Sequence, residues 1–180
     1  MKVVIFILII MVVYFFILYN LLIKRKNKIK QAKSTIDVYL TQRFDLIPNL
    51  VECVKAYNKY ELNTLEKIAE LRTNYMNTKD LKQGEILNKE MNDIILNVEN
   101  YPELKASEQF LILQKSLIKM ENRLQAARRI YNHEVSQYNI IISVFPNNLF
   151  ANIFNLKKEI LFEAEELKTN NINVKKIINK

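Results

Sequence analysis

Glycine, proline, cysteine and histidine are scarce in this chain of 180 residues. The sequence holds one glycine, Gly84, together with three prolines, one cysteine and one histidine. Tight turns draw heavily on glycine and proline, so the chain cannot supply the many turns that a β-rich fold needs. The composition therefore predicts long helices joined by few loops.

The lone cysteine and the lone histidine exclude several kinds of site. Cys53 cannot form an internal disulfide, and a cysteine-based zinc or iron–sulfur centre needs more than one thiolate. His133 precedes Glu134, but an HExxH zinc site and a di-iron bundle both need a second histidine. A single glycine also rules out a glycine-rich phosphate loop. We therefore expect no metal, no cofactor and no catalytic residue.

An uncharged run of 21 residues, Val3 to Ile23, lies at the start of the sequence. As a helix it would span about 32 Å, close to the roughly 30 Å of a bilayer's hydrocarbon core. A cleaved signal peptide is the alternative. The run is too long for one, only Lys2 precedes it, and no small-x-small cleavage site follows. Residues 1–23 are therefore predicted to form an uncleaved transmembrane anchor.

Positive charges follow this run directly. The basic flank consists of Lys24, Arg25, Lys26, Lys28, Lys30 and Lys33. Because only Lys2 lies on the other side, the positive-inside rule predicts an N-terminus outside and a cytoplasmic C-terminal domain. The flank and Lys2 supply seven of the eight net positive charges, which leaves +1 for residues 34–180. The basic excess can contact anionic lipid headgroups, and we expect no binding to nucleic acid.

Apolar residues recur every three or four positions along most of the remaining chain, as is typical of amphipathic helices. We expect helices from the anchor to about 43, and over about 48–76, 85–99, 107–144 and 147–167. Residues 77–84 are predicted to form a polar loop and 169–180 a frayed polar tail. Short loops favour antiparallel neighbours. The prediction is an all-α protein: a transmembrane helix, then an antiparallel up-down four-helix bundle with a short extra C-terminal helix, together covering 24–168.

One question of geometry stays open at this stage. A helix over residues 107–144 would be about 57 Å long, so it would overrun the membrane surface if the first helix left the bilayer upright. Either the bundle tilts at a joint near residues 24–27, or the long helix bends.

Two long motifs resemble the LemA family. The first comprises Ile36-Asp37-Val38, Leu40, Arg43 to Val51, Lys55-Ala56-Tyr57 and Glu61. The second comprises Tyr101 to Ala106, Phe110, Leu113-Gln114, Glu121-Asn122, Ala126 to Arg129, Tyr131-Asn132, Tyr138-Asn139 and Phe145-Pro146-Asn147. In both, the matching residues occur in the family's order, and the match covers about residues 20–162.

The resemblance implies a bacterial inner-membrane protein with an N-out topology and a left-handed, up-down four-helix bundle. It implies no reaction, and it links the chain with membrane or envelope processes. The family's usual aromatic residue near the end of the last helix would here be Phe162.

Polar residues gather at the expected turn between the first two helices. Asp45 is expected to cap the helix that has Pro48 in its first turn and Asn49 beside it. Arg43 is expected to pair with Asp37 or Asp45. We interpret this group as a structural cap and ion pair, with catalysis as the less favoured alternative.

A row of polar residues runs along the longest expected helix. Gln114, Glu121 and Arg128 recur every seven residues, and Asn132 and Asn139 continue the row. The apolar seam beside it includes Tyr131 and Tyr138, Tyr101-Pro102 precedes the helix, and Phe145-Pro146 ends it. Glu61 faces the seam of the second helix. A buried polar network that fixes helix register is favoured, and a proton-transfer or ligand site inside the bundle is the alternative.

Three functions remain open from the sequence. The favoured one is a non-catalytic, membrane-anchored scaffold or adaptor whose partners are the lipid bilayer and another membrane or envelope protein. A self-assembling structural protein, with a second copy as its partner, is the alternative. An enzyme or ligand sensor using Glu61, Glu121 and Arg128 is the least favoured.

Overall fold

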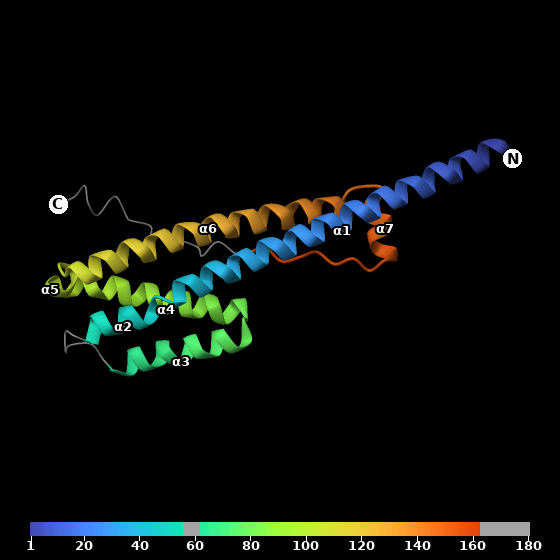
Figure 1. Ribbon diagram of the computed structural model, residues 1–180. Coiled ribbons are helices and arrows are strands. Elements are labelled where there is room, and N and C mark those ends of the chain that lie inside the picture. Colours follow the sequence, from blue (N-terminus) through green and yellow to red (C-terminus); the bar gives the residue numbers. More distant parts are fainter. Residues whose placement is uncertain (56–61, 163–180) are drawn as a thin grey trace, which may run out of the picture. The chain divides into compact units, whose positions relative to one another are not determined.

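The computed structural model describes residues 1–55 and 62–162, and most of these are helical with no strand among them (Figure 1). The helices in chain order are α1 (Lys2–Phe44), α2 (Ile47–Lys55), α3 (Leu62–Thr78), α4 (Leu81–Asn97), the 3-10 turn η1 (Val98–Asn100), α5 (Pro102–Lys105), α6 (Glu108–Ser143) and α7 (Asn147–Ile153). The all-α prediction is confirmed. The up-down order of four helices stays a prediction.

The chain forms two compact units. The first unit takes residues 1–29 and the chain from residue 131 onward, and the second unit takes residues 30–130. Both boundaries fall inside helices, so α1 and α6 each contribute one part to either unit.

α1 joins the apolar run to the predicted first bundle helix without interruption. It runs unbroken through residues 24–27, where a joint was one of the two options. Its first part is the one helix in the described chain that is long and apolar enough to cross a membrane, and most of its side chains there are exposed. From Ile29 onward one face is buried at helical spacing, which matches the predicted seam. The buried residues are Ile29, Ala32, Ile36, Leu40 and Phe44.

The core of the second unit is built from buried faces of α1, α2, α3, α4 and α6. On α2 and α3 the buried residues are Ile47, Leu50, Val54, Leu65, Ile68 and Tyr75. The predicted seam of α4 and η1 is buried at Leu87, Met91, Ile94 and Val98. On α6 the buried seam residues within this unit are Phe110, Leu113, Leu117, Leu124 and Ala127. α6 begins where it was predicted to begin, because the Ser107 hydroxyl accepts the N–H of Phe110 at 3.3 Å.

The predicted single helix over residues 48–76 is wrong. Arg72, within α3, donates its Nε–H to the carbonyl of Phe44, the last residue of α1, at 3.0 Å. Pro48 and Arg72 are 24 positions apart, and in one straight helix they would be separated by about 36 Å. Arg72 could then not reach Phe44, which precedes Pro48, so the chain reverses direction between α2 and α3. The spacing of apolar residues persists through the reversal because both helices bury one face. Tyr57 and Glu61, which were predicted on this seam, lie outside the described residues.

Gly84 belongs to a helix and not to the predicted loop over residues 77–84. α3 continues to Thr78, and Asp80 caps α4 by accepting the N–H of Lys82 at 3.2 Å. Gly84 is buried in the first turns of α4. A Cβ at this position would lie 2.9 Å from a ring carbon of Tyr75 and 3.0 Å from a methyl of Leu40. Glycine therefore serves close helix packing here.

The last helix is shorter than predicted. α7 ends at Ile153, and residues 156–162 are not helical. Asn155 adopts a left-handed conformation, with φ of 49°, and the N–H of Leu156 returns to the carbonyl of Ala151 at 2.9 Å. This arrangement terminates a helix. The rest of the predicted helix, with Leu167, and the predicted tail lie outside the described residues.

Gly84→Ala is expected to lower the free energy of unfolding by about 1–2 kcal/mol, because the added methyl overlaps a buried tyrosine ring. Helix propensity acts in the opposite direction and favours alanine by about 1 kcal/mol. Loss of the helical circular-dichroism signal in detergent, followed against temperature or urea, measures the difference.

Lys89 provides the matched control, because it is exposed on the same helix. Comparing Lys89→Gly with Lys89→Ala gives the propensity term alone. If Gly84→Ala stabilised the protein by that same amount, the close packing at Gly84 would be refuted.

Candidate functional site

A buried arginine in α1 is the centre of a polar cluster in the second unit. Arg43 is 1% exposed, between the apolar residues Leu40 and Phe44 of the same helix. Its Nη2 donates to Oδ1 of Asn92 on α4 at 2.5 Å, and its Nη1 forms an ion pair with Glu121 on α6. Arg43 thus connects three helices that are far apart in the sequence.

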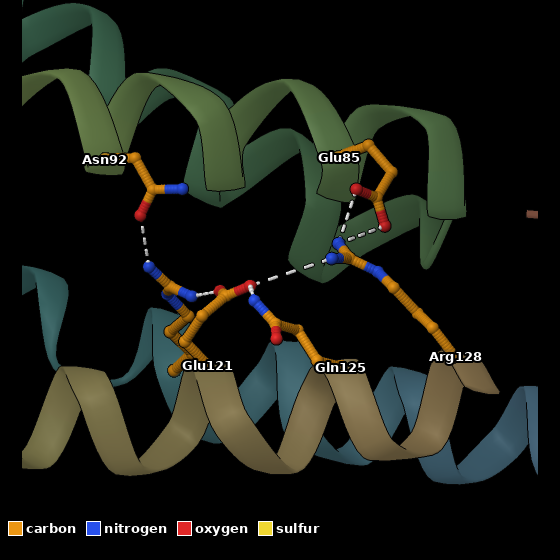
Figure 2. Close-up of polar contacts among 6 residues, drawn as sticks. Glu85, Asn92, Glu121, Gln125 and Arg128 are labelled. Carbon is orange, nitrogen blue, oxygen red and sulfur yellow. Dashed lines mark hydrogen bonds and ion pairs between the residues drawn. The ribbon is translucent and has the colours of Figure 1, made fainter. Parts of the chain in front are cut away.

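Glu121 lies between two arginines. One of its oxygens pairs with Arg43, and the other lies 3.7 Å from Nη1 of Arg128, one heptad further along α6 (Figure 2). The same oxygen accepts a hydrogen bond from Nε2 of Gln125 at 3.2 Å. Of the predicted row of polar residues on this helix, Glu121 and Arg128 are therefore the two that meet in the cluster.

Arg128 reaches across to α4. Its Nη2 donates to both carboxylate oxygens of Glu85, at 2.7 and 2.5 Å (Figure 2). Charge-assisted bonds of this kind are about twice as strong as neutral ones. The second bridge links α6 to α4 near the first turn of α4, whereas Asn92 anchors Arg43 two turns further along.

The cluster is electrically balanced. Its two guanidinium groups and two carboxylates all take part in ion pairs with one another. Burial, and then the neighbouring Arg128, lower the pKa of Arg43 to about 10, while Glu85 raises it. The guanidinium therefore stays charged at neutral pH and neither donates nor accepts a proton there.

The arrangement of the cluster suits the registration of helices. The Nε atoms of both arginines and Oδ1 of Asn88 are buried without a hydrogen-bond partner among the described residues. The described residues also contain no group of three or more histidine, cysteine, aspartate or glutamate side chains that could hold a metal ion. Each ion pair joins different helices or a turn of α6, so the cluster links α1, α4 and α6.

The acids expected to pair with Arg43 have other partners. Asp37 accepts the hydroxyl of Tyr75, and burial, followed by this hydrogen bond, raises the pKa of that tyrosine. Asp45 pairs with Arg72 at 3.3 Å. Arg43 faces the bundle interior instead, because at helical spacing it shares a face with Leu40 and Ile36.

The remaining residues of the predicted motifs lie outside the cluster. Pro48 is in the first turn of α2, as predicted, and is exposed together with Asn49. Gln114 is half-buried and has no hydrogen bond within the described part of the chain. Pro102 begins α5, after the half-buried Tyr101. Glu61 lies outside the described residues.

Sequence reasoning missed the partners on α4. Glu85, Asn88 and Asn92 are spaced by three and four residues, which puts them on one face of that helix. Asn88 is nearly as buried as the neighbouring Leu87 and Met91. A polar row beside the apolar seam of α4 was the available signal, parallel to the one recognised on α6.

The first unit contains a second polar arrangement, made by two asparagines of α6. The side-chain amide of Asn139 donates to the carbonyl of Glu159 at 2.9 Å and accepts its N–H at 2.9 Å. The side-chain amide of Asn132 likewise donates to the carbonyl of Phe162 at 2.9 Å and accepts its N–H at 2.8 Å. Each side-chain amide therefore makes the pair of hydrogen bonds that a backbone peptide group would make in a β-sheet. We call this pair of residues the asparagine clamp.

The distance between the two asparagines along α6 matches the distance between their partners along the extended chain. Asn132 and Asn139 are seven residues apart on a helix, about 10.5 Å along its axis. Three residues of extended chain, from Glu159 to Phe162, cover about 10 Å. Tyr131 adds a hydrogen bond from its hydroxyl to the carbonyl of Ile160 at 3.1 Å, and its ring packs edge-on against Phe162 at 4.9 Å. The clamp explains why the chain after Leu156 is extended and not helical.

The basic flank of α1 also has partners within the first unit. Arg25 and Lys28 pair with the half-buried Glu134 at 2.9 and 3.6 Å. Lys26 lies over the ring of Tyr138, with Nζ 5.8 Å from its centroid. Tyr138 is fully buried, and burial raises its pKa. The other predicted flank residues, Lys24, Lys30 and Lys33, are exposed.

Glu121→Gln is expected to lower the free energy of unfolding by about 3 kcal/mol, because it leaves the buried Arg43 without its counter-charge. Adding Arg43→Met should restore part of this loss, since it removes the unpaired charge. Chemical unfolding of the single and double variants in detergent measures both effects.

Glu90→Gln is the control, because Glu90 forms an exposed pair with Lys67 at 2.6 Å. Removing an exposed pair should cost less than about 1 kcal/mol. Additive losses in the Arg43→Met and Glu121→Gln variants would show that the two residues are not coupled.

Asn139→Ala is expected to speed hydrogen exchange at the amide of Glu159 on the order of tenfold, because two hydrogen bonds to the extended chain disappear. Asn139→Asp should have a smaller effect on this amide, since it keeps an oxygen that accepts the N–H of Glu159 and removes only the donor to the Glu159 carbonyl. Asn122→Ala, at an exposed position of the same helix, should leave that exchange rate unchanged. An unaltered rate in Asn139→Ala would mean that the clamp does not hold the segment.

Comparison with known proteins identifies the family of the chain. The sequence model of the LemA family matches residues 32–175. The "Protein LemA" of Metamycoplasma hominis is 27% identical over 165 residues, covering 89% of this chain and 75% of that protein. The magnetosome proteins MamQ 1 and MamQ 2 of Paramagnetospirillum magneticum are 34% identical over 68 residues, covering 38% of this chain and 25% of theirs. The chain belongs to the LemA family.

Proposed function

We propose that this protein is a non-catalytic, membrane-anchored scaffold or adaptor that presents its helical bundle to another membrane or envelope protein. The observation that carries the proposal is the continuity of α1, which runs from the apolar span at Val3 to the buried residues Leu40 and Phe44. The anchor and the first bundle helix are one element. Tethering of this kind raises the local concentration of the bundle for partners in the same membrane.

The proposed topology is N-terminus outside and bundle in the cytoplasm, in a bacterial inner membrane. It is supported by the one-sided basic flank after the span, opposed only by Lys2. An impermeant thiol reagent applied to intact cells should label a cysteine tag placed at the N-terminus. Labelling of a C-terminal tag instead would show the opposite orientation and refute the proposed topology.

The polar cluster supports a structural role. Its charges are paired with one another across α1, α4 and α6, and Arg43 stays protonated at neutral pH. A proton-transfer site needs a group that changes its charge near the working pH. Under this proposal the cluster keeps the three helices in register so that their outer faces form a constant surface.

Self-assembly is the second candidate, and one observation favours it. Three large apolar side chains are exposed within two turns of α6: Leu111, Ile112 and Ile118, at 42%, 61% and 54%. Exposed apolar groups on one helix are a common feature of interfaces. In this case the partner would be a second copy of the chain.

A photo-crosslinking residue at position 112 of the full-length protein in native membranes tests the proposal. The expected result is a discrete adduct with a different membrane or envelope protein. The same adduct should form when residues 1–23 are replaced by an unrelated transmembrane helix, because the bundle and not the span selects the partner.

A crosslinker at the exposed Lys89 of α4 is the positional control, since it monitors a different helix. Adducts with a second copy alone would favour self-assembly. If neither position gave any adduct in membranes, the scaffold proposal would be refuted.

A further inference from the structure

The turn between α6 and α7 carries an exposed apolar surface that the bundle does not use. The large apolar side chains exposed there are Val144, Phe145, Leu149, Ile153 and Phe154. Phe145 and Ile153 are 79% and 77% exposed, more than Leu21 or Ile23 in the span itself. Exposed apolar patches of this kind mark sites of interaction with a protein or a membrane.

The sequence around this turn is free of charge over an unusual length. Between Glu134 and Lys157 lie 22 residues without an aspartate, glutamate, lysine or arginine. Two lysines, Lys157 and Lys158, follow at once. The order of an uncharged stretch and then lysines is the same as in the anchor and its basic flank, although this second stretch includes five asparagines.

The turn packs on the span. The rings of Phe15 and Phe150 are stacked at 4.6 Å, and the hydroxyl of Tyr14 donates to the side-chain oxygen of Asn147. Within the uncharged run of α1, the shielded residues Phe15, Leu18 and Leu22 form one face at helical spacing. α7 therefore lies beside the part of α1 predicted to be in the bilayer.

The depth of this contact follows from α1. Phe15 precedes Lys24 by nine residues, which corresponds to about 13 Å along the helix. That is somewhat less than half of a hydrocarbon core of roughly 30 Å. α7 itself has seven residues, about 10.5 Å, and is too short to cross a bilayer.

The charged residues of the two chain segments lie at a common level. Lys26 packs over Tyr138, and the next residue, Asn139, binds Glu159, which follows Lys157 and Lys158 directly. The lysines after α7 are therefore close to the basic flank of α1. Together they form a positive border beneath the apolar turn, which complements anionic headgroups.

The backbone of the turn is also suited to a water-poor environment, where unpaired polar groups are costly. Pro146 has no N–H group. The following residues of the turn donate their N–H groups to carbonyls of the same segment: Val144, Asn148, Leu149, Phe154, Asn155 and Leu156.

We propose that the turn from Val144 to Phe154 inserts into the hydrocarbon of the leaflet next to the basic flank, as a second and non-spanning membrane element beside α1. Its occupant is the acyl region of a phospholipid bilayer, continuous with the lipid around α1. The inference rests on the proposed membrane anchor, and it adds a contact that anchoring by α1 alone does not require.

Depth-dependent quenching in vesicles tests the inference. The full-length chain carries Cys53→Ser, which removes its only cysteine, and one new cysteine with a polarity-sensitive fluorophore at Ile153, Ile17 or Ile118. The vesicles contain phosphatidylcholine and phosphatidylglycerol, with a fraction of lipids bearing a nitroxide on the acyl chain. We expect blue-shifted emission and strong quenching at Ile153 and Ile17, and neither effect at Ile118.

The three positions separate the possible failures. Quenching at Ile17 but not at Ile153 would overturn the inserted turn and leave the anchor intact. Absence of quenching at both Ile17 and Ile153 would refute the proposed membrane anchor as well as the inserted turn. Quenching at Ile118 as strong as at Ile153 would also overturn the inference, because the turn would then be no more lipid-exposed than α6 of the bundle.

A second pair of variants tests the apolar surface itself. With the fluorophore at Leu149, the double substitution Ile153→Lys and Phe154→Lys should abolish the quenching, since lysine is strongly disfavoured in hydrocarbon. The matched Ile118→Lys should leave it unchanged. Equal quenching in both variants would contradict insertion of the turn.

Discussion

Arg43 imposes the constraint on which the second unit depends. A charged guanidinium is costly to bury unless its charge is balanced. The balancing groups come from α4 and α6, so a charge fixed in α1 selects both of its neighbours. Apolar packing alone tolerates small shifts of one helix along another, whereas Glu121, held between two arginines, does not. The cluster thus joins α1, α4 and α6 through polar contacts that lie beside the buried apolar faces of the same helices.

α1 changes in character along its length. Its first part is long and apolar enough to cross a membrane and exposes most of its apolar side chains, and its second part buries only one face. The change occurs over the basic flank. There Arg25 and Lys28 form ion pairs with Glu134, and Lys26 lies over the ring of Tyr138. The flank therefore binds α1 to α6 in the first unit.

Much of this organisation could be predicted from the sequence, and the failures have a common cause. Periodicity identified the buried faces of α1, α4 and α6, since spacing alone determines which residues share a face. It could not identify the partner of Arg43, because Asp37 is a neighbour in sequence and Glu121 is not. It also predicted a helix through Leu156 and Ile160, where hydrogen bonds from distant asparagines favour extended chain. Gly84 was assigned to a loop because its close contact with Tyr75 is a tertiary property.

The asparagine clamp has a consequence for how this part of the chain can diverge. Asn132 and Asn139 read only backbone atoms of Glu159 and Phe162, so almost any side chain can occupy those two positions without loss of the four hydrogen bonds. Proline is the exception, since it has no N–H to donate. The side chains of the segment can therefore change in composition, length and charge while its path along α6 is kept. That path is determined by two residues of α6, outside the segment itself.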